Sequence, residues 1–388
     1  MRGAAPGQAT ARRRRRGWLL LGLLVLVAAL WAPVSRHVRA ASLLLRFEGA
    51  QEGAAGWVAG LGRHAVGRSD VELATPEGLV RGRRYRPEGA PDAPGLLLVH
   101  GVHFRGMREP RLVRFAEVLA SAGLDVLTPQ VPSLAGLRVE PRATRRIGAS
   151  ASAFAQELNA RSVGVMGISF AGGLALVAAA DPELGGRIGY VVAVGAHHDL
   201  ARVAHWYAGG VAADPSGEPA SVSPHPYGAG VVIHQHVESF FPPEDVPRAR
   251  EALRRLLHER WKEARALVPE LSPRGAERLE AILAREERPE LRARLREVIE
   301  REIAAFRQVS PAGKVGGLDV PVFLVHGSAD PVIPPTETAW LAREIPDARV
   351  EQMVITPFLR HAESRSDPSF GDRWELVRFM AEVLGTAR

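Results

Sequence analysis

The chain has 388 residues, of which 46% are hydrophobic and 24% charged, an ordinary balance for a globular protein with a sizeable core. It contains no cysteine, which excludes disulfides, thiolate metal sites, iron–sulfur clusters and a cysteine nucleophile. The net charge of +7 comes from one end, because residues 1–46 carry nine arginines and no acidic residue. The remainder is close to neutral, so nucleic acid, which is bound through a cationic surface, is not an expected partner.

An uncharged run over residues 17–35 follows the arginine block 12–16 and has Trp18 and Trp31 near its ends. About 20 apolar residues can cross a bilayer as a helix, and indole rings favour the two membrane interfaces. The positive-inside rule would keep the arginines in the cytoplasm and export everything that follows. The sequence therefore favours an uncleaved membrane anchor, with the rest of the protein outside the cytoplasm.

A cleaved secretory signal is the main alternative, and it would make the protein secreted. Val38 and Ala40 occupy the −3 and −1 positions of a possible cleavage site before Ala41. The length of the apolar run, and Arg36 and Arg39 just before the cut, argue against cleavage. A helix buried in the core is the third interpretation of the same run.

Domain boundaries follow from changes in the hydrophobic pattern. Residues 1–40 are assigned to the basic segment with its anchor or signal. The Gly- and Ala-rich residues 41–69, which show no clear period, are assigned to a linker, with a loosely packed amphipathic segment as the alternative. Alternating residues on both sides of a turn at 76–78 predict a β-hairpin over 70–86.

Beyond the hairpin, short apolar runs alternate with helical patterns, which predicts an α/β fold with a mostly parallel sheet and helices on both faces. Strands are expected at 95–100, 124–128, 162–166, 189–195, 320–326 and 349–355, and helices at 110–122, 143–159, 170–180, 335–345 and 371–384. The interval 197–310 is too long for a loop of a compact sheet, and its later part has leucines at helical spacing. We therefore expect a helical cap inserted between two parts of the core, residues 70–196 and 311–388.

The sharpest local signal is the sequence Gly-Ile-Ser-Phe-Ala-Gly-Gly over residues 167–173, between a predicted buried strand and a helix of small residues. A serine on a tight strand-to-helix turn points outward at the carboxyl end of the sheet, and the residues two before and two after it must be small. Gly167 and Ala171 meet this requirement. The helix that follows Ser169 can present the Phe170 amide to a developing oxyanion.

Two further segments end predicted strands in the same way. His100 and Gly101 end an earlier strand, where the next amide, that of Val102, could act as a second oxyanion donor. Asp330 lies in a His-Gly-Ser-Ala-Asp-Pro segment just past a later strand, and His361 follows the strand after that.

With these motifs the chain resembles the serine members of the α/β-hydrolase superfamily that carry an inserted cap. The resemblance covers residues 70–196 and 311–388. It implies that Ser169 is the nucleophile, His361 the base and Asp330 the orienting acid, in the order this family uses. It also implies that Phe170 and Val102 supply the oxyanion hole.

Two points stay open within this assignment. Family members often have glycine just before the catalytic histidine, whereas this chain has Arg360. Asp199, which follows the sixth predicted strand, is a second candidate for the acid, although Asp330 is favoured.

Two histidine-containing groups in the cap are candidate metal ligands: His197, His198, Asp199 and His205, and His234, His236 and Glu238. On a strand, positions 234, 236 and 238 would share one face. The simpler interpretation is that these histidines line the entrance or bind backbone groups. The triad needs no metal or organic cofactor, so none is expected.

The predicted function is hydrolysis of a carboxylic ester through an acyl-enzyme. The expected substrate is a small-molecule or lipid-like ester, because a large cap suits a hydrophobic acyl group that has to be enclosed. A thioesterase, an amidase or an acyltransferase would use the same triad. A catalytically inactive hydrolase fold that serves as a membrane-tethered interaction module is the alternative from another class.

Overall fold

The fold is built around one eight-stranded sheet. The computed structural model describes residues 33–50, 52–286, 288–359 and 369–387. Strand order is β1-β2-β4-β3-β5-β6-β7-β8, with β2 antiparallel to β1 and β4 and every other pair parallel. The strands are β1 (Val66–Thr75), β2 (Gly78–Pro87), β3 (Gly95–Val99), β4 (Asp125–Pro129), β5 (Val163–Ile168), β6 (Ile188–Val194), β7 (Val322–Gly327) and β8 (Val350–Thr356). The mostly parallel sheet is confirmed, and β3 to β8 begin and end within two residues of the expected ranges.

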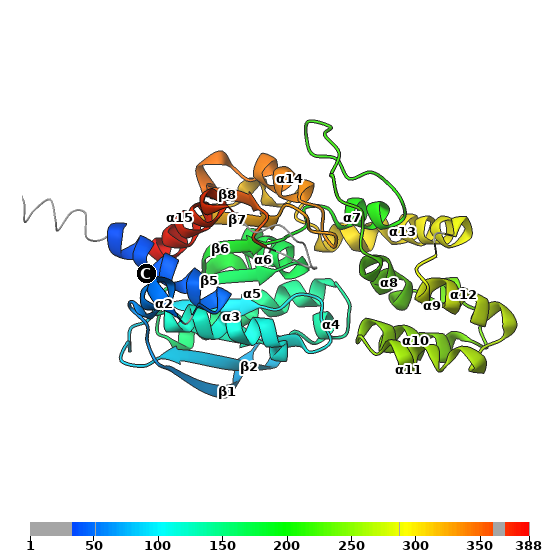
Figure 1. Ribbon diagram of the computed structural model, residues 1–388, viewed down its shortest axis with the longest axis horizontal. Helices are drawn as coiled ribbons and strands as arrows, with labels where there is room; N and C mark the ends of the chain where they lie inside the picture. Colours follow the sequence, from blue (N-terminus) through cyan, green and yellow to red (C-terminus); the bar gives the residue numbers. More distant parts are fainter. Residues whose placement is uncertain (1–32, 51, 287, 360–368, 388) are drawn as a thin grey trace, which may run out of the picture.

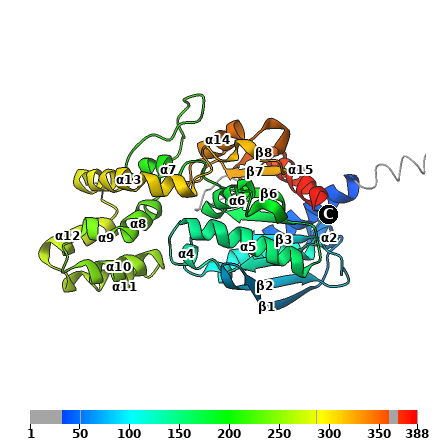
Figure 2. The same ribbon diagram turned by 180° about the vertical axis from the view of Figure 1, so that it is seen from behind.

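Helices cover both faces of the sheet, because the central strands are apolar on both sides. In β3, for example, Leu96 and Leu98 face one buried cluster while Leu97 and Val99 face the other. The helix over residues 33–48, α3 (Pro110–Ser121) and α15 (Phe370–Thr386) cover the face turned to the viewer in Figure 1. The opposite face, seen in Figure 2, carries α5 (Pro141–Glu157), α6 (Phe170–Ala180) and α14 (Thr336–Glu344). The short helix α4 (Pro132–Ala135) follows β4.

The described part of residues 41–69, which was assigned from the sequence to a linker or a loosely packed segment, forms packed helices and the start of β1. The helix over residues 33–48 runs through this boundary, α2 (Gly53–Gly60) follows it, and β1 begins at Val66. Ala40 and Leu43 are fully buried in the cluster shared with α3 and α15. Ser42 donates to the carbonyls of Ala59 and Leu61, at 3.0 and 2.9 Å, which joins this helix to α2. The segment is therefore part of the core.

The expected membrane anchor falls mainly outside the described residues, which begin at residue 33. Among the residues that the structure describes, no helix is long and apolar enough to cross a membrane. The candidate cleavage site before Ala41 lies inside the helix over residues 33–48.

A long insertion leaves the sheet after β6 and returns before β7. It emerges at the carboxyl ends of the strands, because its first helix follows β6 closely, and it extends away from the sheet on the right of Figure 1. Its helices are α7 (Leu200–Tyr207), α8 (Pro226–Gln235), α9 (Val237–Phe240), α10 (Val246–Leu257), α11 (Trp261–Arg265), α12 (Pro273–Leu283) and α13 (Pro289–Val309).

A buried carboxylate fixes the base of this insertion to the core. Glu337 of α14, which has no exposed surface, accepts hydrogen bonds from the amides of His198 and Asp199, both at 2.8 Å. Its other oxygen pairs with Arg202 of α7 at 2.6 Å. The first turn of the insertion is therefore held in place by the core itself.

Candidate active site

Ser169 lies on a strained turn between β5 and α6. Its backbone has φ 58° and ψ −131°, a positive φ that a residue with a side chain adopts only when its surroundings enforce it. The Ser169 amide donates to the Val194 carbonyl of β6 at 2.7 Å, which holds the turn against the sheet. A Cβ atom at Gly167 would come within 2.3 Å of the Ala171 carbonyl oxygen, so only glycine fits two residues before the serine.

The loop after β3 passes directly beside this turn. A Cβ atom at Gly101 would lie 3.2 Å from the Ile168 carbonyl oxygen and 3.3 Å from Cβ of Ser169. The amide of Val102 follows Gly101, and the amide of Phe170 is the first of α6 and so has no acceptor within that helix. Their assignment as oxyanion donors remains a prediction, which the closeness of Gly101 to the serine supports.

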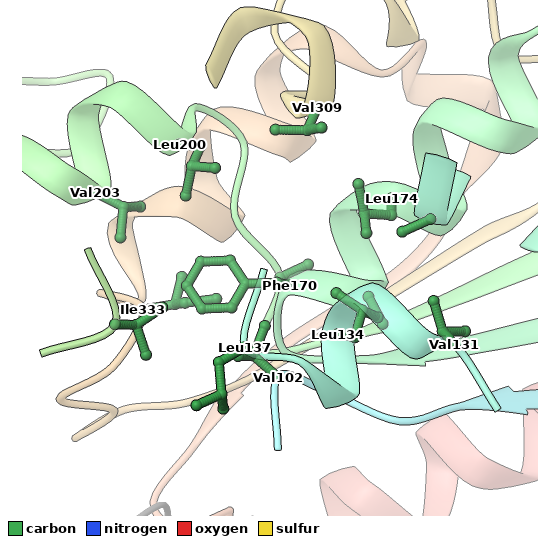
Figure 3. Close-up of a cluster of buried hydrophobic side chains, with 14 of the residues drawn as sticks. Val102, Val131, Leu134, Leu137, Phe170, Leu174, Leu200, Val203, Val309 and Ile333 are labelled. Atoms are coloured by element: carbon green, nitrogen blue, oxygen red, sulfur yellow. The ribbon is translucent and has the colours of Figure 1, made fainter. Parts of the chain in front are cut away.

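The Phe170 side chain fixes the turn from the other side. Figure 3 shows its ring between Ile333, from the segment after β7, and Val102, with Leu200 and Val203 of α7 nearby. All five side chains belong to one buried cluster. Packing therefore holds the nucleophile turn, the loop after β3 and the base of the insertion together.

His100 supports the loop after β3 from beneath. The ring is buried, and its Nδ1 lies 2.8 Å from the Gly101 carbonyl while Nε2 accepts the Val131 amide at 3.1 Å. Nδ1 must therefore donate, which fixes the tautomer. Burial lowers the pKa of His100 from 6.5 to about 4, so the ring is neutral at physiological pH.

Asp330 is a buried carboxylate in the turn after β7. It is 1% exposed, and its Oδ1 accepts the amides of Val332 and Ile333 at 2.8 and 3.1 Å. Its Oδ2 lies 3.5 Å from Nε2 of His326, a buried ring that also contacts the Ile333 carbonyl at 2.9 Å. The rival acid Asp199 caps α7 instead, where its Oδ1 accepts the Ala201 amide at 2.8 Å.

His361 lies within residues 360–368, outside the described residues, so its role remains a prediction. The chain reaches that stretch from β8 and passes the end of β7 on the way. A Cβ atom at Gly327 would come within 2.3 Å of the Leu359 carbonyl oxygen, which places residue 359 against the strand that leads to Asp330.

A cavity of about 420 Å³ includes Ser169 in its wall. Its polar lining residues are His100, His103, Glu109, Arg111, His225, Tyr227 and Glu259, together with the serine itself. The rest of the lining is aliphatic, aromatic, glycine, proline or methionine. An apolar pocket with few polar groups beside a reactive side chain has the usual character of a small-molecule binding site.

The insertion contributes contacts to the site that sequence analysis missed. The Tyr227 hydroxyl donates to the Val102 carbonyl at 3.1 Å, and the His225 amide donates to the Pro331 carbonyl at 2.6 Å. Burial raises the pKa of Tyr227, so the hydroxyl stays protonated and can donate. No local motif could reveal this contact, because 125 residues separate Tyr227 from Val102.

The cap histidines do not form the strand face considered as a metal site. His234 lies in α8, His236 follows that helix and Glu238 lies in α9, where Glu238 pairs with Arg250. Within the part of the chain that the structure describes, no group of three or more His, Asp or Glu side chains is arranged to hold a metal ion.

The strand order and the serine turn after β5 define this protein as a hydrolase of the α/β-hydrolase fold. The chain belongs to the X-Pro dipeptidyl-peptidase (S15) family, whose family model matches residues 151–361, more than half of the chain. No curated protein gives a significant match.

Many solved structures match the chain at low sequence identity. A 2-hydroxy-6-oxo-6-phenylhexa-2,4-dienoate hydrolase from Rhodococcus sp. strain RHA1 is 16% identical, with a TM-score of 0.39 and coverage of 75% of this chain and 91% of that one. An acylaminoacyl peptidase from Pyrococcus horikoshii is 14% identical, with a TM-score of 0.44 and coverage of 84% and 42%. An α/β-hydrolase fold protein from Nakamurella multipartita is 17% identical, with a TM-score of 0.36 and coverage of 74% and 90%.

Proposed function

We propose that the protein is a serine hydrolase that cleaves carboxylic esters through an acyl-enzyme. The observation that carries the proposal is the position of Ser169, on a strained turn in the wall of a largely apolar cavity. A nucleophile in this setting can reach a carbonyl whose acyl group is enclosed by apolar side chains.

The proposed reaction uses groups from four segments, which follow β3, β5, β7 and β8. Ser169 Oγ attacks the ester carbonyl carbon and gives its proton to His361, while Asp330 orients the imidazole. The amides of Phe170 and Val102 hold the oxyanion, and the imidazolium then protonates the departing alcohol. Water then gives a proton to His361 and attacks the acyl carbon, and the imidazolium protonates Ser169 Oγ as the bond from this oxygen to the acyl group breaks, which releases the acid.

The described neighbours of His361 support its role as the base. Leu359 packs at the end of β7, and Asp330 follows that strand in the next turn. His361 is two residues beyond Leu359, and two residues of chain span at most about 7 Å. An imidazole near Asp330 is therefore compatible with the course of the chain.

Peptide cleavage is the second candidate, because the family is named for dipeptidyl-peptidases. Release of a dipeptide requires a group that binds the substrate's free amine, and Glu109 and Glu259 are the acids in the cavity wall. Glu109 is already occupied, since it accepts from Arg111 Nε at 2.9 Å and from the Leu112 amide at 2.7 Å. Glu259 is then the acid left to bind an amine, and the largely apolar lining favours an ester over a dipeptide.

A fluorophosphonate probe tests the nucleophile without the need for the right ester. We expect one adduct by intact mass on the full chain and none on Ser169→Ala. Kinetics with p-nitrophenyl butyrate and alanyl-proline p-nitroanilide then compare ester with dipeptide cleavage, and the ester should be preferred. A folded protein that takes up no adduct and cleaves neither substrate would favour the inactive interaction module.

A further inference from the structure

The cavity beside Ser169 extends far behind the nucleophile along the sheet. Its floor is formed by Met166 of β5, Val192 of β6 and Val325 of β7, which all point to the same face. Met166 precedes Ser169 by three residues, which corresponds to about 10 Å along a strand. The cavity is therefore deeper than the carbonyl group of an ester requires.

Three helices form the outer wall opposite this floor. Each contributes side chains from one helical face: Leu43, Leu44 and Phe47 from the helix over residues 33–48, Leu112 and Phe115 from α3, and Leu376, Phe379 and Met380 from α15. Spacings of three and four residues place such side chains on one side of a helix. Figure 1 shows the three helices on the same face of the sheet.

The helix over residues 33–48 is held firmly in this wall. The Phe47 ring packs edge to face on Phe115 of α3, with 5.2 Å between ring centroids. Arg46 donates to Ser121 Oγ at 2.6 Å, and Arg39 donates to the Ala122 carbonyl at 2.5 Å, both at the end of α3. These contacts fix the side chains of residues 43–47 that face the cavity.

The chemistry of the lining selects the ligand. Apart from Arg111 at the start of α3, every residue that the floor and the three helices contribute is aliphatic, aromatic or methionine. The other titratable lining residues, such as His103, Glu109 and Glu259, come from other segments. A polar group placed against such a lining would lose its water without gaining a hydrogen bond. A long, flexible hydrocarbon chain gains free energy with each methylene that it buries there.

We propose that this cavity binds the long aliphatic acyl chain of the substrate, and that Leu44 and its neighbours on the helix over residues 33–48 set the chain length. The inference rests on the proposed ester hydrolysis, which it deepens by naming the substrate class. The carbonyl would lie at Ser169 and the chain would run back between sheet and helices, with the alcohol toward the charged residues.

The test is a chain-length series on the full chain, with p-nitrophenyl esters from acetate to palmitate. Leu44→Trp should fill the inner cavity and lower the ratio of kcat/KM for palmitate over acetate by about tenfold, the loss expected when about two methylenes are no longer buried. Leu44→Ala should shift the ratio the other way. Val38→Trp is the matched control, because Val38 lies on the same helix, is exposed and does not line the cavity.

The two Leu44 variants guard against a simple folding defect, since damage to the fold would not move the ratio in opposite directions. Thermal unfolding of each variant is measured alongside. Ratios that stay the same in both Leu44 variants, or that change equally in Val38→Trp, would overturn the proposal.

A binding measurement separates this inference from the proposed reaction. Ser169→Ala protein should bind cis-parinaric acid, a fluorescent long-chain fatty acid, and addition of Leu44→Trp should weaken binding by about tenfold. Binding with this dependence in a protein that cleaves no ester would refute only the proposed hydrolysis. Ester cleavage without any such binding or chain-length dependence would refute only the acyl-chain site.

Discussion

Burial of a single residue, His100, makes the stability of the folded protein depend on pH. Its Nε2 faces the Val131 amide, so a proton there would meet another donor. Burial lowers the pKa of His100 to about 4, and burial has the same effect on His197, whose ring nitrogen Nε2 contacts the Val309 carbonyl at 3.1 Å. At mildly acidic pH both rings are therefore neutral in the folded protein, whereas the same histidines are protonated in the unfolded chain.

This difference predicts acid destabilisation over a defined range. Between pH 6.5 and about 4 the unfolded chain binds more protons, so stability falls as the pH falls through this window. The loss from pH 7 to 4.5 should be about 2 to 3 kcal/mol for each of the two histidines. Urea unfolding of wild type and His100→Gln at both pH values checks this. Equal losses in the two proteins would contradict the assignment to His100.

Single-residue predictions from sequence depended on local motifs. Ser169 could be identified from the sequence because the steric contact that requires glycine at position 167 is with Ala171, only four residues away. Asp330 was identifiable because its turn follows a buried strand directly. Tyr227 was not, since its contact with Val102 depends on how the insertion folds back over the core.

Two adjacent arginines of β2 pair with carboxylates on the two neighbouring strands, and burial changes how much each ion pair matters for stability. Arg84 contacts both oxygens of Asp125 at the start of β4, at 2.8 and 2.6 Å, and both side chains are buried. Arg83 contacts Asp70 of β1 at 2.7 Å, but that carboxylate is exposed. Removal of Asp125 would leave the buried Arg84 with the partly exposed Glu157 as its carboxylate partner, whereas removal of Asp70 leaves an arginine that water can reach.

Alanine substitutions of the two aspartates should therefore differ sharply. We expect Asp125→Ala to lower the free energy of unfolding by about 3 kcal/mol, because Arg84 loses its main buried partner. Asp70→Ala, the matched control on the neighbouring strand, should cost less than about 1 kcal/mol. Denaturant unfolding measures both, and similar values would show that the β2–β4 pair is no more than a surface contact.

Among the secondary-structure elements, the sequence predicted those whose own hydrophobic pattern indicates that they are buried. The apolar runs of β3 to β8, bounded by turn residues, could be located within two residues. The helix over residues 33–48 and α2 were missed, because Gly- and Ala-rich segments lack a hydrophobic period. Their positions come from contacts with α3 and α15, such as those of the buried Leu43.

At the scale of the whole molecule, the helix over residues 33–48 links the core to the expected anchor at 17–35. Cleavage before Ala41 would remove the first half of this helix, including the buried Ala40 and the Arg39 bond to α3. We therefore propose that the full chain stays membrane-anchored, with the catalytic domain outside the cytoplasm. After alkaline carbonate washing it should remain in the membrane pellet, and its intact mass should include residues 1–40. A soluble product beginning at Ala41 would instead establish a cleaved signal.

The helix α8 touches two of the segments that surround the serine. Tyr227 bonds to Val102 after β3, and the His225 amide bonds to Pro331 after β7. Lifting α8 would break both bonds, so opening of the insertion would remove one support of the loop after β3. Binding and closure are linked reciprocally. If closure of the insertion strengthens the binding of a transition-state analogue at Val102, then binding of that analogue stabilises the closed insertion by the same free energy.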